Sequence, residues 1–115
     1  MTDRRPIAFI NARLIDPASR LDATGGVIVE GARIATVTPG LAAKDVPEGA
    51  EIIDCAGHVL APGLIDMHVF TGEPGEDHKE TLASAGRAAA AGGVTTIIVM
   101  PDTRPVLDED RKSVV

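Results

Sequence analysis

Apolar residues in the first half of the chain follow the short period of β-strands. Residues 7–16 (IAFINARLID) and 25–40 (GGVIVEGARIATVTPG) carry β-branched side chains with partial alternation, which is typical of half-buried strands. Gly31 and Ala32 suit a two-residue hairpin turn, because glycine adopts the positive φ that the first central position requires. Residues 1–60 are therefore predicted to form a small β-rich subdomain. Loops are expected where Pro, Gly and Asp gather, at residues 17–26 and 39–49.

The pattern changes in the second half, where two apolar runs flank an alanine-rich segment. Residues 63–69 (GLIDMHV) and 94–100 (VTTIIVM) are typical of strands buried on both faces of a parallel sheet. Residues 78–93 (HKETLASAGRAAAAGG) predict a helix with acidic residues near its positive end and two glycines as its stop. The order strand, helix, strand predicts a βαβ unit.

One βαβ unit cannot bury both faces of its own strands. We therefore expect residues 61–109 to be the start of a larger α/β domain, such as an eight-stranded barrel of about 250 residues. In a chain of 115 residues, the strand 94–100 would be an unpaired edge and prone to association.

The last six residues, 110–115 (DRKSVV), depart from the preceding pattern. One reading frame of a common sequencing-adapter oligonucleotide encodes the same letters before a stop codon. We expect these six residues to be an artefact of read-through into the adapter. The alternative is a genuine charged tail.

Composition narrows the function classes. Hydrophobic residues make up 44% and charged residues 24% of the chain, which indicates a globular protein. The formal charge of −6 leaves no basic surface for nucleic acid or an anionic membrane. No window approaches the roughly 20 apolar residues of a membrane span. The single Cys55 is expected to be a buried, reduced thiol, which favours a cytoplasmic location.

Candidate chemistry lies at the strand ends, because the carboxyl ends of barrel strands line the active site. Two histidines separated by one residue point to the same side of a strand and can bind one metal ion. His68 is placed for this role, but Phe70 has no lone pair and cannot bind zinc. The positions to question are Asp66, His68 and Phe70 after the first strand, and Met100, Pro101, Asp102 and Thr103 after the second.

The stretch APGLIDMHVFTGEPGEDHKETLASAGRAAAAGGVTTIIVMPDTRPVLD resembles the dihydroorotase family of the amidohydrolase superfamily. The family pattern runs Pro-Gly-x-x-Asp-x-His-x-His-x-Arg-x-Pro-Gly, then Lys-Glu-Thr, Ala-x-x-Gly-Gly-x-Thr-Thr and Met-Pro-Asn-Thr. The resemblance is close over residues 60–108, and the first half is similar to the sandwich subdomain of these proteins. It implies an α/β fold: a small N-terminal β-sandwich-like subdomain over residues 1–60, then the first βαβ unit of an incomplete (β/α)8 metal-dependent hydrolase barrel.

The resemblance also implies a chemistry. Family members use a binuclear zinc centre, bridged by hydroxide and a carboxylated lysine, to hydrolyse or close a cyclic amide. Such a metal lowers the pKa of bound water toward about 7 and polarises the carbonyl. In dihydroorotases this reaction interconverts dihydroorotate and N-carbamoyl-aspartate in pyrimidine biosynthesis.

Carried over residue by residue, the family pattern is only partly present. His68 matches the first metal-binding histidine, and Phe70 stands where the second should be. Gly72 replaces the arginine that holds the substrate carboxylate, and Asp102 replaces an asparagine that contacts substrate. The resemblance thus implies His68 as a metal ligand and Asp102 as a substrate-binding residue. Because these departures cluster at the barrel mouth, the site is predicted to be degenerate.

Several polar residues also have ordinary structural interpretations. His68 can be a hydrogen-bonded histidine at a strand end, and Asp66 is expected to orient its neighbours. His58 is expected in a turn and His78 in the first helical turn. Glu73 is expected to be an exposed loop residue.

Three functions remain open at this point. The first is a dihydroorotase-like amidohydrolase with a rearranged or degenerate site. The second is a non-catalytic homologue that assembles with aspartate transcarbamoylase and supports it, as an oligomer. The third, an allantoinase- or hydantoinase-like hydrolase, explains the missing arginine but not Phe70.

Overall fold

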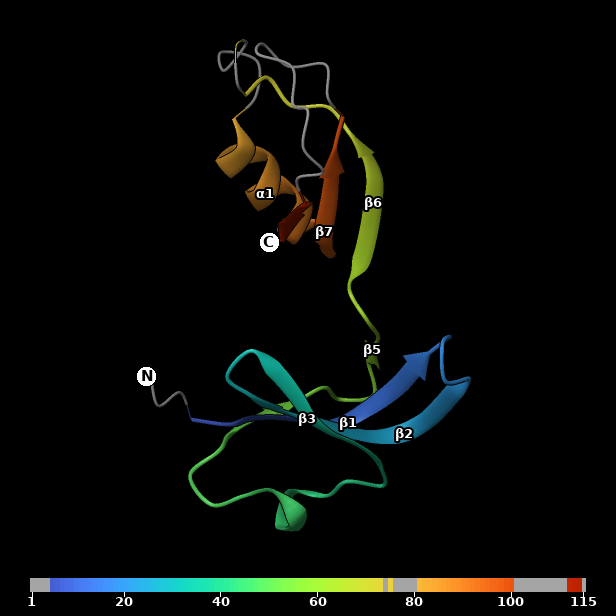
Figure 1. The fold of residues 1–115 in the computed structure, drawn as a ribbon. Coiled ribbons are helices and arrows are strands. Elements are labelled where there is room, and N and C mark those ends of the chain that lie inside the picture. Colours follow the sequence, from blue (N-terminus) through green and yellow to red (C-terminus); the bar gives the residue numbers. More distant parts are fainter. Residues whose placement is uncertain (1–4, 74, 76–80, 101–111, 115) are drawn as a thin grey trace. The chain divides into compact units, whose positions relative to one another are not determined.

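The computed structural model describes residues 5–73, 75, 81–100 and 112–114 (Figure 1). The chain divides between Pro62 and Gly63 into two compact units, Met1–Pro62 and Gly63–Val115. They are called the N-terminal unit and the C-terminal unit below.

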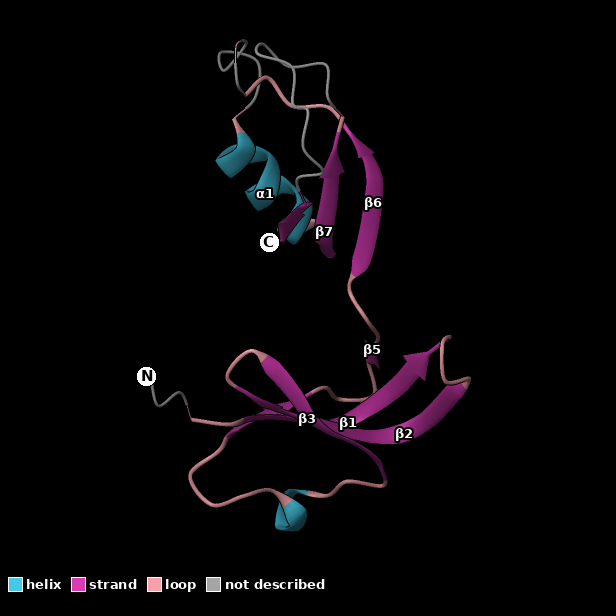
Figure 2. Cartoon of the chain, viewed as in Figure 1, coloured by secondary structure: helices cyan, strands magenta, loops and turns pink. Residues whose placement is uncertain are grey.

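The N-terminal unit is one mixed sheet built around its first strand (Figure 2). In the order β3-β2-β1-β4, β1 pairs antiparallel with β2 and parallel with β4, and short β5 extends the parallel pairing along β1. A 3-10 turn, Ala43–Asp45, precedes β4. The strands are β1 Ile7–Asp16, β2 Leu21–Glu30, β3 Arg33–Pro39, β4 Glu51–Asp54 and β5 Val59–Leu60.

The predicted hairpin is confirmed. Strands β2 and β3 are antiparallel neighbours joined by Gly31 and Ala32 alone. Gly31 has a φ of 58°, the left-handed region that glycine occupies without a side-chain clash.

The prediction of a loop over residues 17–26 is wrong for its second half, because β2 begins at Leu21. Gly25 and Gly26 are buried inside the sheet rather than placed in a turn. A Cβ atom on Gly26 would meet the Phe9 carbonyl oxygen and the Leu41 side chain. These glycines therefore allow close backbone packing inside the sheet. The sequence alone does not distinguish such glycines from glycines in a loop.

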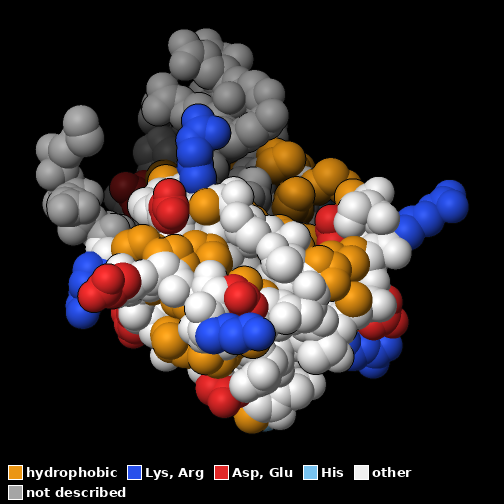
Figure 3. Space-filling model, turned by 90° about the horizontal axis from the view of Figure 1, so that it is seen from below, with side chains coloured by type: hydrophobic (Ala, Val, Ile, Leu, Met, Phe, Trp, Pro, Cys, Tyr) orange, Lys and Arg blue, Asp and Glu red, His pale blue; other side chains and the backbone are white. Residues whose placement is uncertain are grey.

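The core of this unit lies on one face of the sheet. Ala8, Ile10 and Ile28 are buried there beneath Leu41, with Val46 packed against them. The alternate positions of the same strands point to the opposite face. There they line an open apolar groove of about 220 Å³, whose lining includes Phe9, Val27, Val29, Ile34 and Val37. Patches of hydrophobic side chains are visible at the surface in Figure 3.

The C-terminal unit contains the predicted βαβ arrangement. Its elements are β6 Leu64–Val69, α1 Leu82–Ala91, β7 Val94–Val99 and β8 Lys112–Val114. β6 and β7 are parallel, and α1 lies between them in sequence and contacts β7. The helix ends before the C-cap Gly92, as the two glycines predicted. Its predicted start at His78 is wrong, because Thr81 has an extended backbone and is the N-cap, so the first helical residue is Leu82.

Two predictions about these strands are wrong. β7 is not an edge strand, because β8 pairs with it antiparallel on the side away from β6. β6 is not buried on both faces: Leu64 is 62% and Met67 69% exposed, whereas Ile97 of β7 is 2% exposed. The reason is that one helix covers β7 but leaves both faces of β6 open among the described residues.

Within the described ranges, no helix is long and apolar enough to cross a membrane.

Candidate functional site

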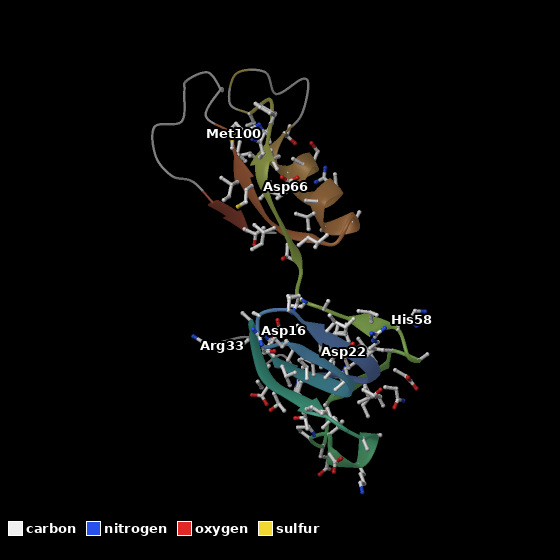
Figure 4. All side chains as sticks on the ribbon, turned by 90° about the vertical axis from the view of Figure 1, so that its right-hand side faces the viewer. Asp16, Asp22, Arg33, His58, Asp66 and Met100 are labelled. Carbon is white, nitrogen blue, oxygen red and sulfur yellow. The ribbon has the colours of Figure 1, made fainter. Side chains whose placement is uncertain are left out.

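The candidate site lies where β6 and β7 end. The two parallel strands finish side by side, and the Met100 backbone N–H donates a 2.8 Å hydrogen bond to the Val69 carbonyl. Figure 4 places Asp66 on β6 and Met100 at the end of β7. Because β6 and β7 are parallel neighbours, their carboxyl ends lie at the same end of the sheet, as predicted.

His68 and Phe70 lie on the same side of the strand end. Their ring centroids are 5.0 Å apart with an interplanar angle of 65°, an edge-to-face contact. This is the i, i+2 geometry in which two histidines could share a metal ion. Here the second ring is a benzene ring, 59% exposed, which offers packing and no lone pair.

Asp66 orients the local backbone. Its Oδ1 accepts a 3.1 Å hydrogen bond from the His68 backbone N–H. The expectation that Asp66 orients its neighbours is borne out for this contact, which holds the backbone of the residue that carries the imidazole.

The remaining predicted site positions divide into described and undescribed residues. Gly72 is buried in the loop after β6. Asp102, Pro101, Thr103 and His78 lie outside the described residues, so the substrate-binding role of Asp102 stays a prediction.

The prediction that Glu73 is an exposed loop residue is wrong. Its Oε2 accepts a 2.8 Å hydrogen bond from the Leu82 backbone N–H, the first residue of α1. It is partly buried rather than a freely exposed loop residue. The contact spans nine positions and follows no capping pattern, so no local sequence signal indicates it.

His58 and Cys55 belong to the N-terminal unit and lie at the turn after β4. His58 Nδ1 lies 2.7 Å from the Cys55 carbonyl oxygen, and Ala56 and Gly57 have positive φ. The prediction of a turn at His58 is therefore confirmed. Cys55 is a free thiol, but it is only partly buried rather than fully buried as expected.

A binuclear zinc centre needs several ligands close together. Among the residues that the structure describes, no group of three or more His, Cys, Asp or Glu side chains could hold a metal ion. His68 has an acidic neighbour on its own strand, but Asp66 is hydrogen-bonded to the backbone and Phe70 fills the second position. These residues alone do not fit a binuclear zinc centre.

Comparison with known proteins identifies the family. The sequence model described as "Dihydro-orotase-like" matches residues 57–114, half of the chain. The chain belongs to the dihydroorotase family. The match includes β6, β7 and the strand ends at which His68 and Phe70 lie.

Individual relatives agree with this assignment. The chain is 48% identical over 103 residues to a dihydroorotase of Wolbachia sp. subsp. Brugia malayi, covering 89% of this chain and 23% of that protein. It is 50% identical over 103 residues to a dihydroorotase of Solibacter usitatus, covering 90% and 23%. The chain thus spans about a quarter of the length of these dihydroorotases.

A solved structure supports the fold. The L-hydantoinase (dihydropyrimidinase) from Arthrobacter aurescens matches with a TM-score of 0.73 and 28% identity over 87% of this chain and 21% of that one. The described part of the chain, which is mostly β with one α-helix, therefore corresponds to the N-terminal region of a hydantoinase, an amidohydrolase.

Proposed function

We propose that this chain is the N-terminal part of a dihydroorotase-like amidohydrolase of pyrimidine biosynthesis whose metal site is degenerate. Identity of about half to named dihydroorotases supports the family chemistry of cyclic amides. The edge-to-face contact of Phe70 with His68 supports the proposal that the metal site is degenerate, because it puts an apolar ring at the second ligand position. In this proposal residues 1–60 are the β-sandwich-like accessory subdomain and residues 61–109 begin a (β/α)8 barrel in a cytoplasmic protein.

The described residues support weak substrate and metal binding in this proposal. His68 would supply one imidazole ligand, held by the Asp66 contact to its backbone. Gly72 offers only backbone where an arginine would grip a carboxylate with two parallel hydrogen bonds. Turnover of dihydroorotate should therefore be low or absent.

The test uses the protein expressed from its complete reading frame. Phe70→His should increase zinc affinity by at least about tenfold, because it restores an imidazole ligand two residues from His68. Phe70→Leu is the matched control, which removes the ring without adding a ligand and should leave zinc affinity unchanged. Rapid dihydroorotate hydrolysis by the unmodified protein would contradict the degenerate site.

A second candidate function follows from the same observation. If Phe70 and Gly72 have removed catalysis, the family scaffold can persist as a structural partner, and we propose aspartate transcarbamoylase as that partner. Co-purification of the complete protein with the transcarbamoylase, unaffected by Phe70→Leu, is the expected result. A clean pull-down without it would reject this candidate.

A third candidate, an allantoinase- or hydantoinase-like hydrolase, is favoured only by Gly72 and by the hydantoinase likeness. Assays of the complete protein with allantoin and hydantoin test it, and hydrolysis of either one with none of dihydroorotate would place it first.

A further inference from the structure

The residues that follow β6 are tied down at two points. At the first point, the Val69 carbonyl accepts a hydrogen bond from the Met100 backbone N–H at 2.8 Å, which joins the end of β6 to the end of β7. At the second point, the Glu73 carboxylate accepts a hydrogen bond from the Leu82 backbone N–H at 2.8 Å, which joins the loop to α1. Three residues, 70–72, lie between these two ties.

The Glu73 contact has a clear physical basis. The first N–H groups of a helix have no partner inside the helix and form its positive end, so a carboxylate there is stabilising. Thr81 already satisfies the Ser84 N–H through its side-chain oxygen. Glu73 supplies the acceptor for Leu82, which the capping box of Thr81 and Ser84 does not provide.

The loop also supports Glu73 from its other side. The Thr71 hydroxyl donates a 3.3 Å hydrogen bond to the Glu73 carbonyl oxygen, and Gly72 between them is buried. The backbone is thus compact from Thr71 to Glu73, and a displacement of the carboxylate would be transmitted to residues 70–72.

We propose that Glu73 is a positioning residue that sets the placement of residue 70 relative to His68. It acts through the loop backbone rather than by touching substrate or metal. Positions 70 and 72 are those at which the dihydroorotase family pattern has a ligand and a substrate-binding arginine, so this role rests partly on the proposed function. The anchoring of the loop to α1 does not depend on it.

The test combines two readouts on the complete protein in the Phe70→His background. Glu73→Ala should accelerate amide exchange at Leu82 about tenfold, since a charge-assisted hydrogen bond is lost. It should also weaken zinc binding about tenfold. Glu73→Gln keeps a carbonyl acceptor and should restore most of both values. Glu48→Ala, which removes an exposed glutamate of the N-terminal unit, is the matched control and should change neither.

Each outcome decides something different. Faster exchange at Leu82 with unchanged zinc affinity would overturn the positioning role and leave only a helix cap. Unchanged exchange, or no rescue by Glu73→Gln, would overturn the anchor itself. If Phe70→His binds no zinc even with Glu73 intact, position 70 is not a ligand position and the positioning role is overturned. Exchange at residues 70–72 then decides the anchor alone: acceleration in Glu73→Ala supports it, and no change rejects it.

Discussion

The two units differ in how completely they bury their own apolar residues. Strand β1 of the N-terminal unit has paired strands on both sides, and Ala8 and Ile10 are buried in the core on one face of the sheet. Leu14, farther along β1, is also buried. In the C-terminal unit the described part of the chain buries Ile97 but leaves Leu64 and its neighbours on β6 exposed. The N-terminal unit therefore has a hydrophobic core on one face, whereas the described residues of the C-terminal unit have the strand pattern of a core but leave β6 uncovered.

This difference shows what a local sequence pattern can specify. The β6–α1–β7 arrangement forms because its signals are local: two apolar runs, an alanine-rich helix and a glycine stop. Burial of β6 is not local, because it requires further elements on both faces. The relatives, of which this chain spans about a quarter, are long enough to supply them.

The largest predicted effect separates the two units directly. Leu14→Ala should destabilise the N-terminal unit by about 2–5 kcal/mol, because Leu14 is 2% exposed. Leu64→Ala, at a residue that is 62% exposed, should change stability by no more than about 0.5 kcal/mol. Urea unfolding followed by circular dichroism measures both. Equal costs would show that β6 is buried in solution and would remove the contrast.

Glycine substitutions sharpen the same contrast. Gly26→Ala should cost about 1–3 kcal/mol, because the new Cβ would meet the Phe9 carbonyl and Leu41 inside the sheet. At Gly92 the nearest atom to a new Cβ is the Ala89 oxygen at 3.5 Å, an ordinary contact. Gly92→Ala should therefore stay within about 0.5 kcal/mol of the unmodified chain. Shifts in the thermal midpoint provide the comparison, and a well-tolerated Gly26→Ala would count against close packing at β2.

The exposed strand β6 predicts self-association of the 115-residue chain. Met67→Lys should weaken that association about tenfold, since a lysine on an exposed edge strand opposes pairing with another chain. Ala43→Lys, at an exposed position of the N-terminal unit, adds the same charge elsewhere and serves as control. Sedimentation velocity gives the association constants. A monomeric chain with one cooperative unfolding transition would refute the prediction.

The smallest predicted effect is a pH dependence confined to the N-terminal unit. The Ala56 backbone N–H, together with the Asn11 side chain, lowers the pKa of Asp54 below its ordinary value. A lowered pKa means that this contribution to stability is present above the unfolded pKa of about 3.9 and is lost as the pH falls through the folded pKa. Asp54→Asn should therefore flatten the fall of the unfolding midpoint as the pH drops below about 4. An unchanged profile would indicate that the carboxylate contributes nothing.

The sequence predicts the elements well where the signal is the period of apolar residues. The strand over residues 7–16 coincides with β1, and the hairpin at Gly31 follows from the φ that its turn requires. The start of β2 could not be predicted this way, because the sequence does not distinguish a glycine inside a sheet from a glycine in a loop. Only the neighbours Phe9 and Leu41 distinguish them.

The candidate site is predictable to a similar degree. The i, i+2 spacing correctly places His68 and Phe70 on one side of β6. The contact of Glu73 with Leu82 depends on how the loop folds back onto α1, which no local pattern encodes. The degenerate site, the role of Asp102 and the origin of residues 110–115 stay predictions, although 112–114 form β8.

The most direct test of the account is the zinc content of the complete protein, purified without chelators and measured by elemental analysis. Because Phe70 stands at the second ligand position beside His68, we predict less than one zinc ion per chain, with more bound by Phe70→His. Two zinc ions per chain in the unmodified protein would contradict the degenerate site and indicate that ligands elsewhere replace the missing histidine.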